Sequence, residues 1–191
     1  MIDENNINEE KYLTCEDKMK HSDNDLNSDR ISVLERVLLT SEHENEKLEA
    51  INQLVRKKDV RAQLAILKAL KDKSWRVREK SINSIRPSSI PSETLTSYLV
   101  SLIDDEFPKV REKAIQLLKG MGKKELLPYF LTKLNDESEL VRSTAIQAIG
   151  EIDYEEMLES FITQFRSETS TQIKHSLLQA ITRIGDETTT N

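Results

Sequence analysis

Apolar residues recur along this chain with the spacing of amphipathic helices rather than the alternation of strands. In the stretch that begins at residue 141, the apolar residues Val141, Ala145, Ile146 and Ile149 stand at relative positions 0, 4, 5 and 8. This spacing places them on one side of a helix. Similar stretches recur along the chain, and a second apolar stripe precedes most of them. The pattern predicts helix, short turn, helix from about residue 28 onwards.

Five of these stretches resemble one another closely. They read EKLEAINQL from Glu46, VREKSINSI from Val77, VREKAIQLL from Val110, VRSTAIQAI from Val141 and IKHSLLQAI from Ile173. Their first residues are 31, 33, 31 and 32 positions apart. Self-similarity at this period indicates a stacked array, in which neighbouring units bury what one unit cannot bury alone. The expected fold is all-α, an α-solenoid of about five antiparallel helix-pair repeats.

Each stretch has a basic residue at its second position and an aliphatic residue at its sixth. The basic residues are Lys47, Arg78, Arg111, Arg142 and Lys174, and the aliphatic ones are Ile51, Ile82, Ile115, Ile146 and Leu178. Four acidic residues each lie six positions before the basic residue of their repeat, namely Asp72, Asp105, Asp136 and Glu168. The basic row has two interpretations, a binding stripe or a structural pairing between adjacent repeats. The recurrent acids favour the structural pairing, and they are also expected to cap the second helices.

Two segments carry the resemblance to a known family. SLIDDEFPKVREKAIQLLKGMG (residues 101–122) and LLPYFLTKLNDESELVRSTAIQAIGEI (residues 126–152) resemble HEAT repeats, in particular the short HEAT-like repeats of bacterial proteins and phycobilisome lyases. The shared pattern is Asp, a few residues, Val-Arg, two residues and Ala. The resemblance covers about residues 28–186. It implies that first helices line the convex side and second helices the concave side, and that the Arg and Asp are architectural. It implies no particular activity, because this repeat serves many functions.

Charge and composition divide the chain into three parts. Residues 1–27 hold eight acidic and three basic residues and few apolar ones, so we expect a mostly disordered acidic leader, with a docked helix at residues 12–19 as the alternative. Residues 28–186 are the expected repeat domain, and residues 187–191 are the expected polar tail.

No apolar run approaches the roughly 20 residues of a membrane span. The single cysteine, Cys15, excludes an intramolecular disulfide and fits a cytoplasmic protein.

The seventh position of the repeat supplies the first candidate site. It is an amide in all five copies: Asn52, Asn83, Gln116, Gln147 and Gln179. These residues lie beside the apolar stripe of the second helices and should reach the concave face. Amides donate and accept hydrogen bonds without the desolvation cost of a charge, which suits binding of an extended protein segment. The alternative, left open, is a solvated gap between two core positions.

Residues 56–86 supply the second candidate, since they hold eleven basic and three acidic residues. The possible anion-binding residues are Lys71, Lys73, Trp75, Arg76 and Arg78. Cations around an aromatic ring can hold phosphates and stack a base. The partner would then be a nucleic acid, another anionic surface or the acidic leader itself. Trp75 is the only tryptophan and has no aromatic cluster beside it in the sequence.

Nothing in the sequence marks a catalytic centre. The three histidines, His21, His43 and His175, are scattered, and no phosphate-binding Gly loop or nucleophile elbow is present, so we expect no metal, no cofactor and no catalytic residue. The predicted function is a non-catalytic intracellular scaffold or adaptor that binds a protein partner on the concave face. The alternatives are anion or nucleic-acid binding through residues 56–86, and an accessory enzyme of bilin-lyase or DNA-glycosylase type. The sequence leaves the oligomeric state open.

Overall fold

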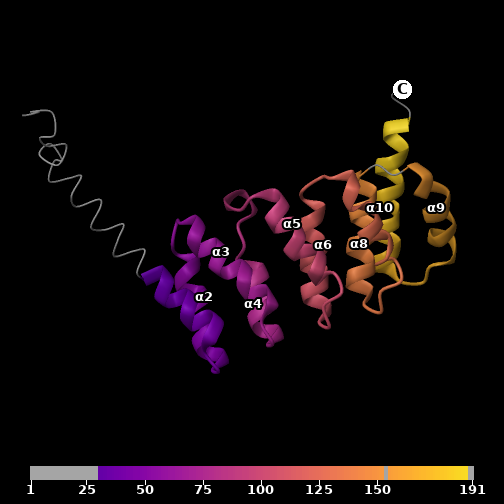
Figure 1. Ribbon diagram of the computed structural model, residues 1–191. Coiled ribbons are helices and arrows are strands. Elements are labelled where there is room, and N and C mark those ends of the chain that lie inside the picture. Colours follow the sequence, from indigo (N-terminus) through magenta and orange to yellow (C-terminus); the bar gives the residue numbers. More distant parts are fainter. Residues whose placement is uncertain (1–29, 153–154, 189–191) are drawn as a thin grey trace, which may run out of the picture.

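A computed structural model describes residues 30–152 and 155–188, and within these ranges the chain consists of helices and turns (Figure 1). Residues 30–40 are helical and belong to the first repeat. The first helices of the later repeats are α3 (Val60–Lys68), α5 (Ser92–Leu102), α7 (Leu127–Leu131) and α9 (Leu158–Ser167). The second helices are α2 (Glu44–Val55), α4 (Trp75–Ser84), α6 (Pro108–Lys119), α8 (Glu139–Ile152) and α10 (Thr171–Thr188). The predicted all-α solenoid is confirmed.

Short 3-10 helices occur at four of the junctions. They span Ala69–Lys71, Pro87–Ser89, Lys124–Leu126 and Glu155–Met157. The proline positions agree with the sequence, since Pro108 begins α6 and Pro128 lies in the first turn of α7. At both places the missing N–H would have had no partner within the helix.

The predicted leader, residues 1–27, lies outside the described residues. At the other end, α10 continues to Thr188, just beyond the predicted end of the repeat domain.

The second helices form a continuous layer. Each packs on the second helix of the next repeat, from α2 through α4, α6 and α8 to α10, while the first helices pack mainly on second helices (Figure 1). The helices on the inner side of a curved array lie closer together than those on the outer side. Consecutive second helices contact one another more closely than consecutive first helices do, which is the arrangement expected from the resemblance. We call the exposed surface of the second-helix layer the second-helix face. None of the described helices is long and apolar enough to cross a membrane.

The repeat positions predict the core correctly in the first four repeats. The first and fifth residues of the stretch at 141, Val141 and Ala145, are fully buried, and so are Ile146 and Ile149. The fifth position of the first four stretches carries a small residue that is also buried: Ala50, Ser81, Ala114 and Ala145. Burial of these stripes between helices is the main source of stability in such an array.

The fifth repeat departs from the prediction at its sixth position. Leu178 was expected to be equivalent to Ile51, Ile82, Ile115 and Ile146, which are all buried, but its side chain is 51% exposed. Within the described residues no further second helix packs on the outer side of α10. The position is buried only where a following repeat covers it. The similarity of the five stretches does not reveal this dependence on a neighbour.

Basic and acidic residues connect the first four repeats in a ladder of ion pairs, which agrees with the structural interpretation for three of the five residues of the basic row. Arg142 and Lys174 form no such pair with any described residue. Lys47 contacts Asp72 of the next repeat at 2.5 Å, Arg78 contacts Asp105 at 2.7 Å, and Arg111 contacts Asp136 at 2.8 Å. All six side chains are almost fully buried. We refer to these three pairs as the ion-pair ladder.

Each arginine of the repeat also ties down the turn of its own repeat. Arg78 Nη1 donates to the backbone oxygen of Asp72 at 2.9 Å, and Arg111 Nη1 donates to that of Asp105 at 2.8 Å. The same contact joins Arg142 to Asp136. One guanidinium therefore holds the acid of the next repeat and the turn before its own helix, which a lysine cannot do with comparable geometry.

The recurrent acids do not cap the second helices in the expected way. Asp72 accepts a hydrogen bond from the backbone N–H of Ser74 at 2.8 Å, and Ser74 is itself the N-cap residue of α4. Asp105 makes the equivalent contact with Phe107, and Glu168 with Ser170. The acid thus shapes the turn that leads into the helix and leaves the first helical N–H groups to other partners. The hydrogen bonds from Ser170 and Thr169 lower the pKa of Glu168.

Helices α8 and α10 approach most closely at a glycine. A Cβ atom built on Gly150 would lie 2.7 Å from Cβ and 2.8 Å from Cα of Ala180. Ser143 and Ser176, both buried, share a hydrogen bond of 2.7 Å across the same interface. Small residues on both helices are required here, because there is no space for a methyl group.

We expect Gly150→Ala to lower the free energy of unfolding by about 1–2 kcal/mol, because overpacking against the Ala180 backbone outweighs the helix propensity gained by alanine. Gly120→Ala is the control, since its Cβ would meet only backbone oxygens at 3.5 Å and 3.6 Å. Urea unfolding of both variants measures the difference. Equal stabilities would show that α8 and α10 are farther apart than described here.

A second prediction concerns the ion-pair ladder. Arg111→Ala should lower the free energy of unfolding by about 3 kcal/mol, because it leaves the buried Asp136 carboxylate without its cation. Lys73→Ala, which removes a cation from an exposed pair with Glu42, should have little effect. Urea titrations of both variants test this, and comparable losses for the two would contradict a structural role specific to the ladder.

Candidate functional site

The five amides predicted to bind a partner lie on five consecutive second helices. Asn52 is on α2, Asn83 on α4, Gln116 on α6, Gln147 on α8 and Gln179 on α10. Asn83 and Gln179 are exposed, and the other three are half-buried at the edge of the core. We call this set the amide row.

The amides differ in how far their hydrogen-bonding groups are already used. Asn52 donates to Glu49 at 3.4 Å, Gln116 donates to Glu112, and Gln147 donates to the Ser176 hydroxyl at 3.1 Å. Asn83 and Gln179 make no side-chain hydrogen bond with any described residue. The row therefore offers open amides on α4 and α10, and partly engaged ones on α2, α6 and α8.

Two shallow depressions hold three of the five amides. The first lies between α2 and α4, has a volume of about 310 Å³ and is lined by Leu48, Trp75, Arg76, Glu79, Lys80 and Asn83. The second lies between α8 and α10, has a volume of about 350 Å³ and is lined by Gln147, Gly150, Glu151, Gln179, Ala180 and Arg183. Both depressions lie where two consecutive repeats meet.

The first depression joins residues that the sequence had assigned to separate sites. Asn83 belongs to the amide row, whereas Trp75 and Arg76 belong to the basic segment. They meet because α4 carries all three residues and because Asn83 lies two helical turns beyond Trp75. A ligand in this depression would contact both sets at once.

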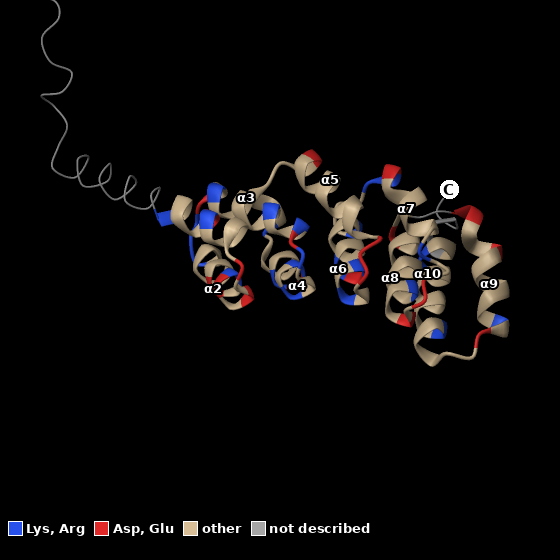
Figure 2. Cartoon of the chain, turned by 60° about the horizontal axis from the view of Figure 1, so that its bottom comes forward, with Lys and Arg blue, Asp and Glu red and all other residues tan. Residues whose placement is uncertain are grey.

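Three cations of the proposed anion set already have partners in the described chain. Lys73 pairs with Glu42 at 2.8 Å, Arg76 pairs with Glu44 at 3.4 Å, and Lys71 lies 5.0 Å from the centre of the Tyr98 ring. Figure 2 shows basic and acidic segments next to one another around α2 and α4. The strong positive charge of residues 56–86 is therefore opposed in space by acids of the first repeat.

Arg78, the fifth residue of the proposed anion set, is part of the ion-pair ladder. Its guanidinium contacts Asp105 and, at 2.9 Å, Glu106. The hydrogen bonds with Asp105 are the main reason why the pKa of Arg78 is raised. Arg78 is buried, so an external anion would meet the other four residues of the set first.

Trp75 has an aromatic neighbour that the sequence did not reveal. Its ring stacks on that of Phe107, with centroids 4.4 Å apart and an interplanar angle of 16°. The Arg76 guanidinium lies 5.1 Å from the centre of the Trp75 ring. Phe107 comes from the turn one repeat later, and only stacking of the repeats brings the two rings together. This stack holds Trp75 rigidly at the edge of the first depression.

The comparisons with known proteins agree with this geometry. Residues 96–182, from α5 into α10, match the family model of HEAT repeats. The repeats of this segment are HEAT repeats. None of the curated proteins matches the sequence of the chain.

Solved structures resemble the helical array along most of its length. An engineered protein is 15% identical, with a TM-score of 0.52 over 84% of this chain and 81% of that one. A designed armadillo repeat protein is 16% identical, with a TM-score of 0.52 over 86% of each chain. The YibA protein of Escherichia coli is 17% identical, with a TM-score of 0.51 over 83% of this chain and 70% of that one. At such identities the likeness shows the fold alone.

Titratable groups on the described part of the array give no sign of a metal centre that the sequence missed. The described residues contain no group of three His, Cys, Asp or Glu side chains that could hold a metal ion. His43 and His175 are exposed and belong to the first and fifth repeats, while Cys15 and His21 lie outside the described residues.

One carboxylate on the second-helix face is perturbed. Burial raises the pKa of Glu112, although Lys113 and the hydrogen bond from Gln116 act in the opposite direction. Because the pKa is higher in the folded than in the unfolded chain, the ionised Glu112 costs stability at neutral pH.

We therefore expect Glu112→Gln to raise the free energy of unfolding at pH 7. The gain should shrink as the pH falls through the raised pKa of Glu112, and it should vanish below the ordinary glutamate value of 4.5. Urea titrations of the wild type and the variant at several pH values measure this. A difference that does not depend on pH would show that burial of Glu112 is not its cause.

Proposed function

We propose that this chain is a non-catalytic scaffold or adaptor that binds an extended segment of a protein partner along its second-helix face. The observation that carries the proposal is the amide row, which places one amide on each of five consecutive second helices. A peptide backbone presents N–H and C=O groups in turn, and an amide side chain can pair with either. A row of amides can therefore hold a peptide that runs across the repeats.

The two depressions support the same proposal. They lie at the two ends of the amide row and are each large enough for a side chain, so that an extended segment could anchor itself at both ends. The first has Trp75 and Arg76 at its edge, and these are residue types enriched at the centres of protein interfaces. Because Trp75 is fixed by Phe107, it loses little conformational freedom when a partner binds.

The charges of the two depressions favour a protein partner over a nucleic acid. The first contains Arg76 and Lys80 together with Glu79, and the second contains Arg183 together with Glu151. A nucleic-acid interface needs cations in excess along one face to replace the counterions of the phosphates. Mixed charges suit a partner that carries both signs.

The test replaces three amides of the two depressions by alanine, namely Asn83, Gln147 and Gln179. A partner is first captured with the full chain and located on it by cross-linking, and its affinity is then measured by calorimetry. Since each lost hydrogen bond costs about 0.5–1.5 kcal/mol net, we expect affinity to fall by roughly ten- to a thousandfold. Circular dichroism should show unchanged folding, because none of the three side chains is fully buried.

Two matched variants make the result specific. Replacing three amides outside the depressions, Asn135, Gln164 and Gln172, by alanine should leave affinity unchanged. Reversing Lys71, Lys73 and Arg76 to glutamate tests anion binding. If the charge reversal abolishes binding, with a steep salt dependence in the wild type, while the amide variant binds normally, the basic segment is the site and the proposal fails.

A further inference from the structure

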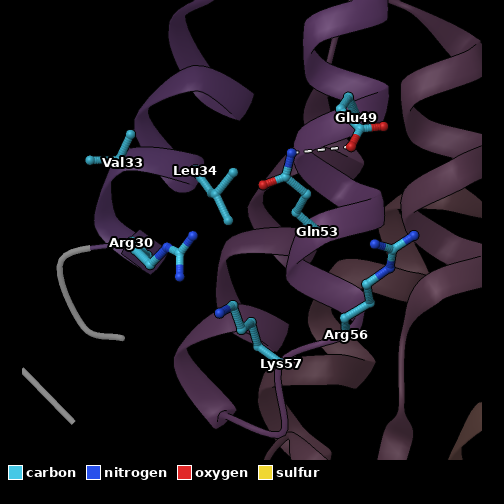
Figure 3. A pocket seen from close by; sticks show the side chains of 7 residues that line it. All are labelled: Arg30, Val33, Leu34, Glu49, Gln53, Arg56 and Lys57. Carbon is cyan, nitrogen blue, oxygen red and sulfur yellow. Dashed lines mark hydrogen bonds between the residues drawn. The ribbon is translucent and has the colours of Figure 1, made fainter. Parts of the chain in front are cut away.

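A groove lies at the N-terminal end of the described array, apart from the two depressions of the second-helix face. It has a volume of about 530 Å³ and is lined by Arg30, Val33, Leu34, Glu49, Gln53, Arg56 and Lys57. In Figure 3, Arg30, Val33 and Leu34 project from the helix at residues 30–40, and Glu49 and Gln53 project from α2. A smaller depression of about 470 Å³ adjoins it and shares Leu34, Glu49 and Gln53.

The floor of the groove is partly exposed apolar surface. Val33 is 49% exposed, while Leu34 and Val37 are only partly buried against the core. Terminal units of repeat arrays normally need a polar outer face or a capping element. This end exposes apolar residues instead, Val33 above all, and exposed apolar surface of this kind favours a capping element that covers it.

The rim of the groove is basic. Arg30, Arg56 and Lys57 make no ion pair with any described residue, in contrast to Lys73 and Arg76 of the next repeat. The only acid in the lining is Glu49, whose carboxylate accepts hydrogen bonds from Gln53 at 3.1 Å and from Asn52 at 3.4 Å. The contact with Gln53 is the main reason why the pKa of Glu49 is lowered. Three cations without an ion pair, opposed in the lining only by Glu49, suit an acidic segment that also carries apolar side chains.

We propose that this groove binds the acidic leader, residues 1–27, of the same chain. The leader carries eight acidic and three basic residues, so its charge is opposite to that of the rim. Its apolar residues, among them Tyr12, Leu13 and Met19, can occupy the floor beside Val33 and Leu34. The leader then serves as the N-terminal cap of the HEAT array and covers what a preceding repeat would cover.

The covalent connection favours the leader over a partner in solution. Only Ser28 and Asp29 separate it from Arg30, which itself lines the groove. A tether this short gives an effective concentration on the order of millimolar, so even weak contacts suffice. Met19 is 11 residues before Arg30. Eleven residues can span roughly 35 Å when extended, which allows a helical or a looped path into the adjoining groove.

The experiment uses the single cysteine of the full chain, Cys15, as the attachment point of a nitroxide. Amide and methyl spectra are compared with the nitroxide oxidised and reduced. We expect Val33, Leu34 and Gln53 to lose most of their peak intensity in the oxidised state, while α8 and α10 keep theirs. Equal intensities in both states at all groove residues would overturn the proposal, and so would uniform losses along the array.

Paired charge reversals identify the cause of docking. Arg56→Glu with Lys57→Glu should restore the peak intensities of the groove, and added salt should restore them in the wild type. Lys123→Glu with Lys124→Glu is the matched control, because it changes net charge equally at two neighbouring lysines away from the groove. Restoration by both variants would overturn the role of the rim.

A mixing experiment separates docking within one chain from docking between chains. Isotope-labelled chains without nitroxide are mixed with unlabelled chains that carry it on Cys15. We expect no loss of intensity in the labelled chains. Losses at the groove in this mixture would mean that the leader occupies the groove of a second copy, which contradicts the proposal. Neither result bears on the amide row, so this proposal and the proposed function can fail separately.

Discussion

The ion pair that links a second helix to the turn before the next second helix is the directional contact that places the first four repeats on one another. A helix pair with one apolar side cannot bury that side alone, and its neighbour must stand at one height and one angle to bury it well. Apolar contacts alone do not fix the height or the angle of the neighbouring repeat strictly, because they are non-directional. The pairs of Arg78 with Asp105 and Arg111 with Asp136 are directional and buried, so they define how each repeat is placed on the next. Each arginine also fixes the turn of its own repeat.

This regular placement creates the second-helix face. Because consecutive second helices pack side by side, one position of the repeat recurs along the surface from α2 to α10. The amide row is that position, and the depressions between α2 and α4 and between α8 and α10 are the gaps beside it. A site of this kind has no single centre. Its specificity depends on the side chains at the edge of each depression. Trp75 and Arg76 make the first depression different from the second.

The two ends of the described array expose apolar residues because each end lacks a neighbouring repeat on one side. A position that is core in the first four repeats becomes surface where no following repeat covers it, as Leu178 shows on α10. At the other end of the array, Val33 adds exposed apolar surface on the helix at residues 30–40. Repeat arrays therefore either carry polar substitutions at their ends or recruit a cap. The basic rim of Arg30, Arg56 and Lys57 gives the N-terminal end a charge that the acidic leader can match, and the end and the cap would then be parts of one chain.

The sequence by itself determined the fold class, the number and order of helix pairs, the core positions of the first four repeats and the pairing of basic with acidic residues. All of these follow from local periodicity and from the recurrence of residue types at one period, and both are present in the linear order. Only the tertiary structure decided which side chains from different repeats meet. It brought Phe107 onto Trp75 and placed Asn83 and Arg76 in one depression. It also placed Lys73 beside Glu42 and left Leu178 exposed. These contacts depend on the rise and rotation from one repeat to the next, which packing sets after the helices have formed.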